Sequence, residues 1–347
     1  MRSIWILISV LLFLTPQRIF AQQTATVKGT IADYYRFKDK KNSVKITVTD
    51  PERVTHTLIP DDQGNFELTF LKLFKQDIQI QFNEYTPIKT LIAPDQYQTY
   101  ILNPIKYDLH LIDCIGDGAA TVKIMGDYFA SIKKYRDGND FRYSTPYIKP
   151  SLGSLMASQA ILENYINNHK VNEDFVQWAR ADIKNEYAYY TVYNQSNQHS
   201  SVTDSFFVDF PLDDTNSLIS SNYLRMLNYR AFDISFNNNY VTTTYAGVKS
   251  IQQYAEIIQK FQPEYAEKLE DYPVDKSDRV KVKYIVKNST GKVRDIWLAN
   301  LITASYKKKD KSIRFQERLM RDYKEFVPNG IYSKRLEQQL AIISDVR

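Results

Sequence analysis

Hydrophobic and polar residues alternate with a period of two from residue 24 to about residue 112. A half-buried antiparallel strand has this pattern because successive side chains point to opposite faces of its sheet. Turn residues such as Asp50-Pro51 and Pro94-Asp95 separate the runs. The clearest runs lie at residues 27–31, 44–48, 66–70 and 78–82. This spacing predicts an antiparallel β-sandwich of about seven strands over residues 22–113.

The hydrophobic period changes to 3.6 residues from about residue 150, which predicts an all-α helical domain over residues 151–347. In one expected helix, Asn172 is a suitable N-cap, and the core-facing stripe comprises Val176, Ala179, Ile183, Tyr187 and Tyr190. Five more stripes begin at Leu224, Val248, Val293, Leu319 and Tyr332. Residues 114–150 hold four of the ten glycines and are expected to form a connector with one or two short elements. The expected fold class is α+β multidomain.

The first 21 residues have the pattern of an export signal. Arg2 precedes an apolar run at residues 4–14, and Ile19-Phe20-Ala21 precedes a suitable cleavage point. As a helix this run rises only about 16 Å, whereas the hydrocarbon core of a membrane is about 30 Å thick. No cysteine follows the run, which argues against a lipoprotein anchor. We therefore expect a cleaved signal peptide, no later membrane span and a periplasmic or secreted protein, with a short uncleaved anchor as the alternative.

The charge balance gives no drive toward nucleic acid. The chain has 45 Lys plus Arg against 40 Asp plus Glu, and removal of residues 1–21 takes away Arg2 and Arg18, which leaves 43 against 40. A surplus of three charges is too small to favour a polyanion by itself. The basic run at residues 307–311 is expected to be a solvated loop, and a contact for anionic surfaces is the alternative.

The chain contains one cysteine, Cys114. A single cysteine excludes an intramolecular disulfide, a CxxC redox pair and any multi-cysteine metal site. Because Cys114 follows an apolar run at the end of the sheet region, we expect it to be buried as a small hydrophobe. A catalytic nucleophile and an intermolecular disulfide are the alternatives.

The motifs that carry cofactor or metal chemistry are incomplete. Gly116-Asp117-Gly118 has Thr121 where a dinucleotide fingerprint needs its third glycine, so a turn is expected there. Residues 137–140 resemble the start of a calcium loop, but Ile148 stands where the bidentate glutamate is required. Metal-ligand spacing is also missing among the histidines, which are His56, His110, His169 and His199. We therefore expect no metal and no cofactor.

Catalytic residues are not predicted either. No GxSxG elbow is present, and the adjacent carboxylates Asp213-Asp214 and Glu270-Asp271 do not place two acids across a cleft as a glycosidase requires. A hydrolase whose site assembles from distant residues remains an alternative function.

The most unusual feature of the composition is 26 tyrosines. Tyrosine rings stack on sugars or peptides and anchor protein interfaces. Tyr187 and Tyr190 fall on the expected core stripe, which favours packing. Tyr189 and Tyr193 fall off this stripe, and they are the candidate binding residues.

Two parts of the chain are similar to a known family. Val27-Lys28-Gly29-Thr30-Ile31 and residues 62–68 (DQGNFEL) resemble the carboxypeptidase-regulatory-like, prealbumin-type sandwiches that open many exported proteins of the Bacteroidetes. Residues 291–297 (GKVRDIW) and 326–340 (FVPNGIYSKRLEQQL) resemble the helical segment that precedes the thioredoxin-like domain in exported thiol–disulfide oxidoreductases of that group.

The resemblance implies an accessory role. In that family the helical segment leads into a domain with two active-site cysteines, and neither cysteine exists here. We therefore predict an exported, non-catalytic binding or scaffolding protein whose partner is another exported protein or a second copy of itself. A stand-alone protein that binds a glycan or a peptide is the alternative.

Overall fold

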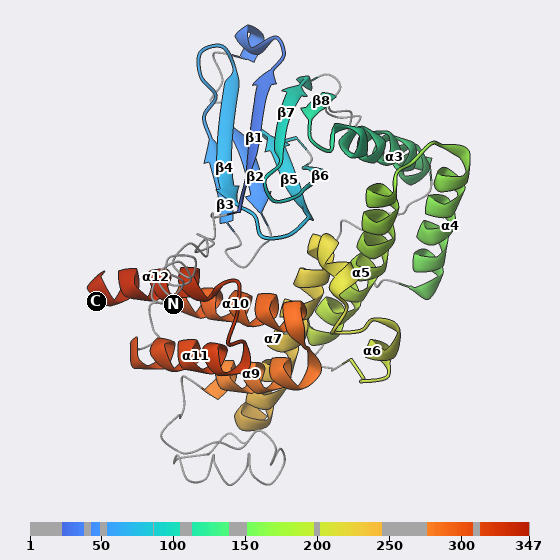
Figure 1. Cartoon of the computed structure of the whole chain (residues 1–347). Helices are drawn as coiled ribbons and strands as arrows, with labels where there is room; N and C mark the ends of the chain where they lie inside the picture. The colour runs from blue at the N-terminus through green and yellow to red at the C-terminus, as the bar shows by residue number, and fades with distance from the viewer. Residues whose placement is uncertain are drawn as a thin grey trace, which may run out of the picture.

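The computed structural model describes residues 23–37, 43–48, 54–85, 87–104, 113–138, 151–197, 202–244, 276–307 and 313–346. The expected signal peptide and the helical stripe that begins at Val248 lie outside these residues. The described residues form an α+β structure with eight strands and nine α-helices. Figure 1 shows the strands gathered at one end, with α3, α4 and α5 beside them and α9 to α12 below.

The strands form two four-stranded sheets. One sheet has the order β4-β1-β7-β8 and the other has the order β3-β2-β5-β6. Their inner faces share one core, in which Val27, Ile46 and Phe82 are fully buried. The strands are β1 (Thr24–Ile31), β2 (Val44–Val48), β3 (Val54–Leu58), β4 (Asn65–Leu71), β5 (Gln76–Phe82), β6 (Ile88–Ile92), β7 (Tyr97–Leu102) and β8 (Asp113–Gly116).

The alternation in the sequence correctly predicts which residues face this core, but it does not predict every strand pairing. The expected sheets were antiparallel, whereas β1 pairs with β7 in parallel, with Thr26 opposite Tyr97. The expected count was about seven, and β8 adds an eighth strand through antiparallel pairing with β7. Position 29 faces inward on β1 and is occupied by glycine, because the ring of Phe66 fills the space that a side chain would need.

The expected connector at residues 114–150 contains regular structure. The turn at residues 116–118 has Gly116 and Gly118 at positive φ, as a tight turn requires, and it joins β8 to helix α3 (Ala119–Gly138). Asp117 completes the turn, because its Oδ2 accepts a 3.1 Å hydrogen bond from the Tyr97 N–H. The predicted turn is therefore confirmed, and the expected domain boundary at residue 113 falls at the start of a strand.

The remaining helices occupy most of the chain after residue 150. Asn172 precedes α5 as predicted, and its Oδ1 accepts a 3.0 Å hydrogen bond from the Phe175 N–H. Helix α10 lies at the centre of the C-terminal group, since every residue from 295 to 303 is buried. These elements are α4 (Leu152–Asn168), α5 (Glu173–Asn197), α6 (Phe206–Asp209), the 3-10 helix η2 (Thr215–Ile219), α7 (Ser221–Thr244), α9 (Lys276–Asn288), α10 (Gly291–Tyr306), α11 (Ile313–Phe326) and α12 (Ser333–Val346).

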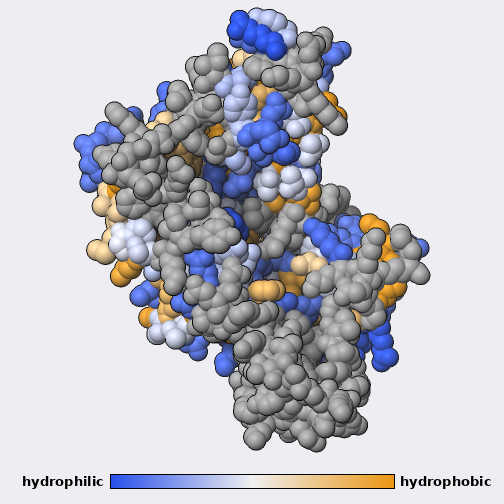
Figure 2. Space-filling view, turned by 180° about the vertical axis from the view of Figure 1, so that it is seen from behind, coloured by the Kyte–Doolittle hydropathy of each residue, from blue (hydrophilic) through white to orange (hydrophobic). Residues whose placement is uncertain are grey.

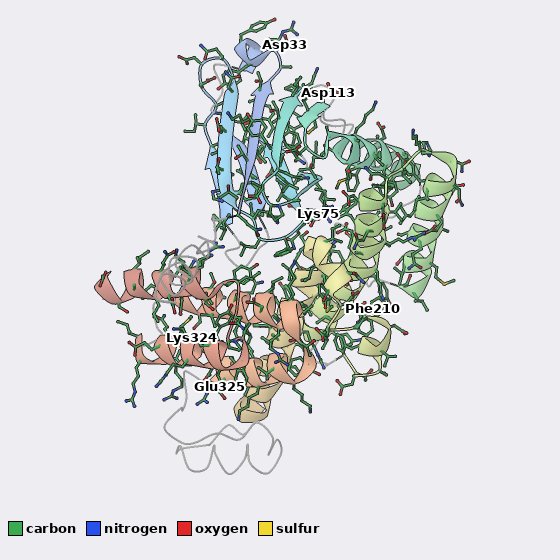
Figure 3. The ribbon with its side chains drawn as sticks, in the orientation of Figure 1. Asp33, Lys75, Asp113, Phe210, Lys324 and Glu325 are labelled. Atoms are coloured by element: carbon green, nitrogen blue, oxygen red, sulfur yellow. The ribbon has the colours of Figure 1, made fainter. Side chains whose placement is uncertain are left out.

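The sheets and the helices share buried side chains. Phe74, in the loop between β4 and β5, is 4% exposed and belongs to the core of α5, α7, α9 and α10. Leu91 of β6 packs in a cluster with α3, α4 and α5, and Val122 of α3 packs into the core between the sheets. Figure 3 shows Lys75 at the end of the strands that faces the helices, where its Nζ lies 2.7 Å from Asp174 Oδ1 of α5. The sheets and the helices therefore bury surface against each other.

Among the described helices, none combines the length and the apolar character that a membrane crossing needs.

Candidate functional site

The two candidate tyrosines lie where α5 runs beside α7. Tyr189 was expected to lie off the core stripe, and this was wrong, because its side chain is only 5% exposed. Helix α5 contacts α3, α4, η2 and α7, so it has more than one buried face. Tyr193, one turn further along α5, is half-buried. The expected core tyrosines Tyr187 and Tyr190 are also half-buried, and Tyr187 packs on Phe210 with ring centroids 5.4 Å apart.

Aromatic rings from α5 and α7 form a continuous group that we call the aromatic seam, comprising Tyr189, Tyr190, Tyr193, Tyr229 and Phe232. The ring centroids of Tyr189 and Tyr229 are 5.2 Å apart, and those of Tyr193 and Tyr229 are 5.1 Å apart, both edge to face. Edge-to-face pairs at this separation are favourable because the ring edge is positive and the face negative. Phe232 is 49% exposed, so the seam reaches the surface.

Arg225 of α7 lies over the seam. Its guanidinium carbon is 4.1 Å from the centroid of the Tyr189 ring, a cation–π contact. Its Nη1 donates one long hydrogen bond of 3.3 Å to Asn222 Oδ1. Within the described part of the chain, no carboxylate lies at ion-pair distance from this guanidinium.

Two tyrosines of the seam, Tyr190 and Tyr229, have raised pKa values. Burial raises the pKa of Tyr190, and the nearby Glu186 raises it further. Burial likewise raises the pKa of Tyr229, with the neighbouring Tyr189 adding to the effect. Both phenols are therefore hydrogen-bond donors at neutral pH.

A second group of functional side chains joins β5 and β6 to α5 and α7, and we call it the buried junction. Lys89 Nζ donates hydrogen bonds of 2.9 and 2.7 Å to the two oxygens of Asp182, and it lies 3.8 Å from Asp77 Oδ2. The side chains of Lys89 and Asp182 are 16% and 10% exposed, and that of Asp77 is fully buried. Two carboxylates thus share one ammonium group.

The first residues of α7 complete the junction. Asp77 Oδ1 accepts a 2.6 Å hydrogen bond from the Ser221 N–H, and Asp77 Oδ2 accepts a 3.0 Å bond from the Ser221 hydroxyl. The Ser220 hydroxyl and the Asn222 amide donate to Asp182 Oδ1 at 2.7 and 3.0 Å. The positive end of the helix dipole stabilises this excess of negative charge.

Burial and charge act in opposite directions on these groups. Burial raises the pKa of Asp77, and the attraction of Lys89 only partly opposes this effect. For Lys89, burial lowers the pKa, but Asp182, Asp77 and Glu186 together outweigh burial, and the pKa is raised. Lys89 is therefore charged at neutral pH, and Asp77 is the group that takes up a proton most readily.

The junction has the composition of a catalytic site but the geometry of a structural one. Ser220 and Ser221 are 0% and 3% exposed, and each hydroxyl donates to a carboxylate that also accepts a second donor. A serine nucleophile needs access to substrate and a base that is free to take its proton. The sequence analysis did not identify these residues. The alternation gave no signal for them, because Asp77 and Lys89 occupy outward positions of β5 and β6, where polar residues are ordinary.

Cys114 packs against the core between the sheets. It is half-buried, and burial raises the pKa of its thiol to about 12, an effect that a hydrogen bond from Tyr100 partly offsets. A thiol at neutral pH is a poor nucleophile, so these surroundings favour the expected packing role.

The remaining candidates are dispersed. His56 lies on β3 and His169 caps the end of α4, whereas His110 and His199 lie outside the described residues. Asp213 caps α10, since its Oδ1 accepts a 3.0 Å hydrogen bond from the Thr290 N–H. Glu270-Asp271, residues 139–140 and residues 308–311 also lie outside the described residues. Across the residues that can be described, no three His, Cys, Asp or Glu side chains are grouped to hold a metal ion.

The surface gives a second view of possible sites. Figure 2 shows hydrophilic and hydrophobic residues interspersed over the described part of the rear face. Apolar side chains exposed by more than half lie on several elements; they include Val208 and Ile342, and Leu152 with Met156 one turn apart on α4. Hydropathy alone therefore does not identify a site. The aromatic seam is selected because it combines aromatic rings with the charged Arg225.

No family model, curated protein or solved structure matches the chain.

Proposed function

We propose that the protein is an exported, non-catalytic binding or scaffolding protein in which the sheets and the helices act as one unit. The observation that carries the proposal is the shared burial between the two parts. The β4–β5 loop places Phe74 in the helical core. The junction adds buried hydrogen bonds in which Asp77 accepts from Ser221 of α7 and Lys89 donates to Asp182 of α5. Such a scaffold holds surface groups in a constant relative position, which lowers the entropic cost of binding.

The aromatic seam is the proposed contact surface. Tyrosine and arginine are enriched among the residues that dominate binding energy at protein interfaces. The seam combines Tyr193, Tyr229 and Phe232 at or near the surface with Arg225, and two helices that pack along each other hold these residues in place. Rings that are already ordered lose little conformational entropy on binding.

Site-specific cross-linking in the producing cells tests this function. A photoreactive benzoylphenylalanine replaces Phe232, and the control chain carries it in place of Met156, an equally apolar exposed residue of α4. We expect one defined exported protein to be linked through position 232 and not through position 156, identified by mass spectrometry. Equal products from both positions, or none from position 232, would contradict a binding role for the seam.

The non-catalytic part of the proposal has its own test. Purified protein with dithiothreitol is assayed for reduction of insulin disulfides beside a thioredoxin. We expect the rate to equal that of dithiothreitol alone, because the single cysteine cannot form an active-site pair. A rate comparable to that of the thioredoxin would show that the protein is an enzyme.

A further inference from the structure

Arg225 has unused hydrogen-bonding capacity. A guanidinium carries five N–H donors, and the hydrogen bond to Asn222 uses one of them. Two other arginines of the helices use more of their donors. Arg180 makes two 2.9 Å bonds to Glu163, and Arg294 donates to the Ser289 and Val286 carbonyls. Arg225 therefore differs from these two arginines, because most of its donors have no partner among the described residues.

The position of this guanidinium is set before any partner binds. Its carbon lies over the ring of Tyr189, which is itself buried and in edge-to-face contact with Tyr229. A guanidinium that rests on an aromatic face keeps its N–H edge for bidentate binding of a carboxylate. An arginine held in this way loses less conformational entropy on binding than a free surface arginine.

Arg225 is the group that favours an anionic partner, because the other charges near the seam are balanced or negative. Asp182 and Asp77 balance the charge of Lys89. Glu186 is a further carboxylate near Lys89 and Tyr190. Arg225 lies near Tyr190 and partly opposes the rise in the pKa of that tyrosine. Within the described ranges, no carboxylate is in ion-pair contact with Arg225. Burial raises the pKa of Tyr190, so the hydroxyl of this ring is protonated.

We propose that the aromatic seam binds an acidic segment of a partner protein, with a glutamate or aspartate carboxylate held by Arg225. This inference rests on the proposed function and names the chemistry of the partner. Phe232 is half exposed at the end of the seam, and an apolar side chain of the partner segment packs there. A peptide is the chosen partner because one segment can bring both a carboxylate to Arg225 and an apolar side chain to Phe232.

Peptide binding to the full chain tests the proposal. The probe is a fluorescein-labelled twelve-residue peptide of alternating glutamate and tyrosine, and its control has glutamine in place of glutamate. Binding is followed by fluorescence anisotropy. We expect the glutamate peptide to bind at least tenfold more tightly than the glutamine peptide, because a buried bidentate pair with a carboxylate is strong.

Variants locate the effect on one residue. Arg225→Gln should weaken binding of the glutamate peptide at least tenfold, and Arg225→Lys should restore only part of it, because an ammonium group cannot make the bidentate contact. Arg180→Gln, on the side of α5 that faces α4, is the matched control and should leave binding unchanged. A thermal melt checks that each variant is folded. If Arg225→Gln is not folded, Phe232→Ser serves as the second variant. Phe232 is half exposed, so its replacement should leave the fold intact and still weaken binding.

Three results would overturn the proposal. They are no binding of the glutamate peptide up to millimolar concentration, equal affinity of wild type and Arg225→Gln, and binding of an oligogalacturonate while the peptide does not bind. The cross-link from position 232 separates this failure from failure of the proposed function. If Arg225→Gln forms the same cross-linked product in the same yield, the protein binds a partner through the seam without the carboxylate contact.

Discussion

The buried junction predicts that its two aspartates respond very unequally to the same substitution. Asp182 makes the two short bonds to Lys89, whereas Asp77 lies 3.8 Å from that ammonium group and is destabilised as an anion by burial. We therefore expect Asp182→Asn to be much more destabilising than Asp77→Asn, although the two changes are chemically identical.

The size of the effect follows from what each change leaves behind. Asp182→Asn keeps an acceptor for Ser220 and Asn222 but leaves the Lys89 ammonium group without its main partner, and breaking a buried ion pair costs about 3–5 kcal/mol. Lys89 is 16% exposed and retains Asp77, so we expect a loss of about 3 kcal/mol, at the lower end of that range. Asp77→Asn keeps an acceptor for the Ser221 N–H and removes a desolvated charge, so we expect a change below about 1 kcal/mol.

Urea unfolding at pH 7, followed by circular dichroism, measures both free energies. The m-value of each variant must match that of the wild type, so that the midpoints report stability alone. A thermal melt should agree, with about 1–2 °C lost for each kcal/mol in a chain of this size. The reasoning is refuted if Asp77→Asn costs as much as Asp182→Asn, or if Asp182→Asn unfolds at the wild-type midpoint.

Three further predictions follow from single residues. Phe74→Ala should cost about 3–5 kcal/mol in urea unfolding because it empties a buried site, and a ΔG equal to wild type would show that the β4–β5 loop is not anchored in the helical core. Because burial raises the pKa of Asp77 above its ordinary value of 3.8, the folded chain binds this proton more readily than the unfolded chain. The contribution of Asp77 to the free energy of unfolding therefore increases as the pH falls from its folded pKa toward 3.8. In urea unfolding across this pH range, Asp77→Asn should remove that increase relative to wild type. Cys114, with a pKa of about 12, should react with iodoacetamide at pH 8 at least a hundredfold more slowly than in urea, and equal rates would show that the thiol is accessible.

The local pattern of the sequence predicted the local structure well. Alternation identified the inward positions of the strands, Asn172 was correctly predicted as an N-cap, and the turn at residues 116–118 was expected from its glycines. These features depend on backbone geometry over a few residues, and the period of two or 3.6 is visible within one element. The α+β class follows from the same signal.

Pairings between distant segments were decided by the tertiary structure. The parallel pairing of β1 with β7, and the addition of β8 to that sheet, depend on the path of the chain between strands. The burial of Tyr189 was missed because one helical stripe describes a helix with one buried face, whereas α5 packs against neighbours on several sides.

The candidate site depends on the same long-range information. Asp77, Lys89 and Asp182 meet from three elements, and the sequence separations are 93 residues between Lys89 and Asp182 and 144 between Asp77 and Ser221. The guanidinium of Arg225 is held over the ring of Tyr189, which belongs to another helix. The sequence by itself determined the elements, since their periods are local, and only the packing of those elements decided which charges and rings came together.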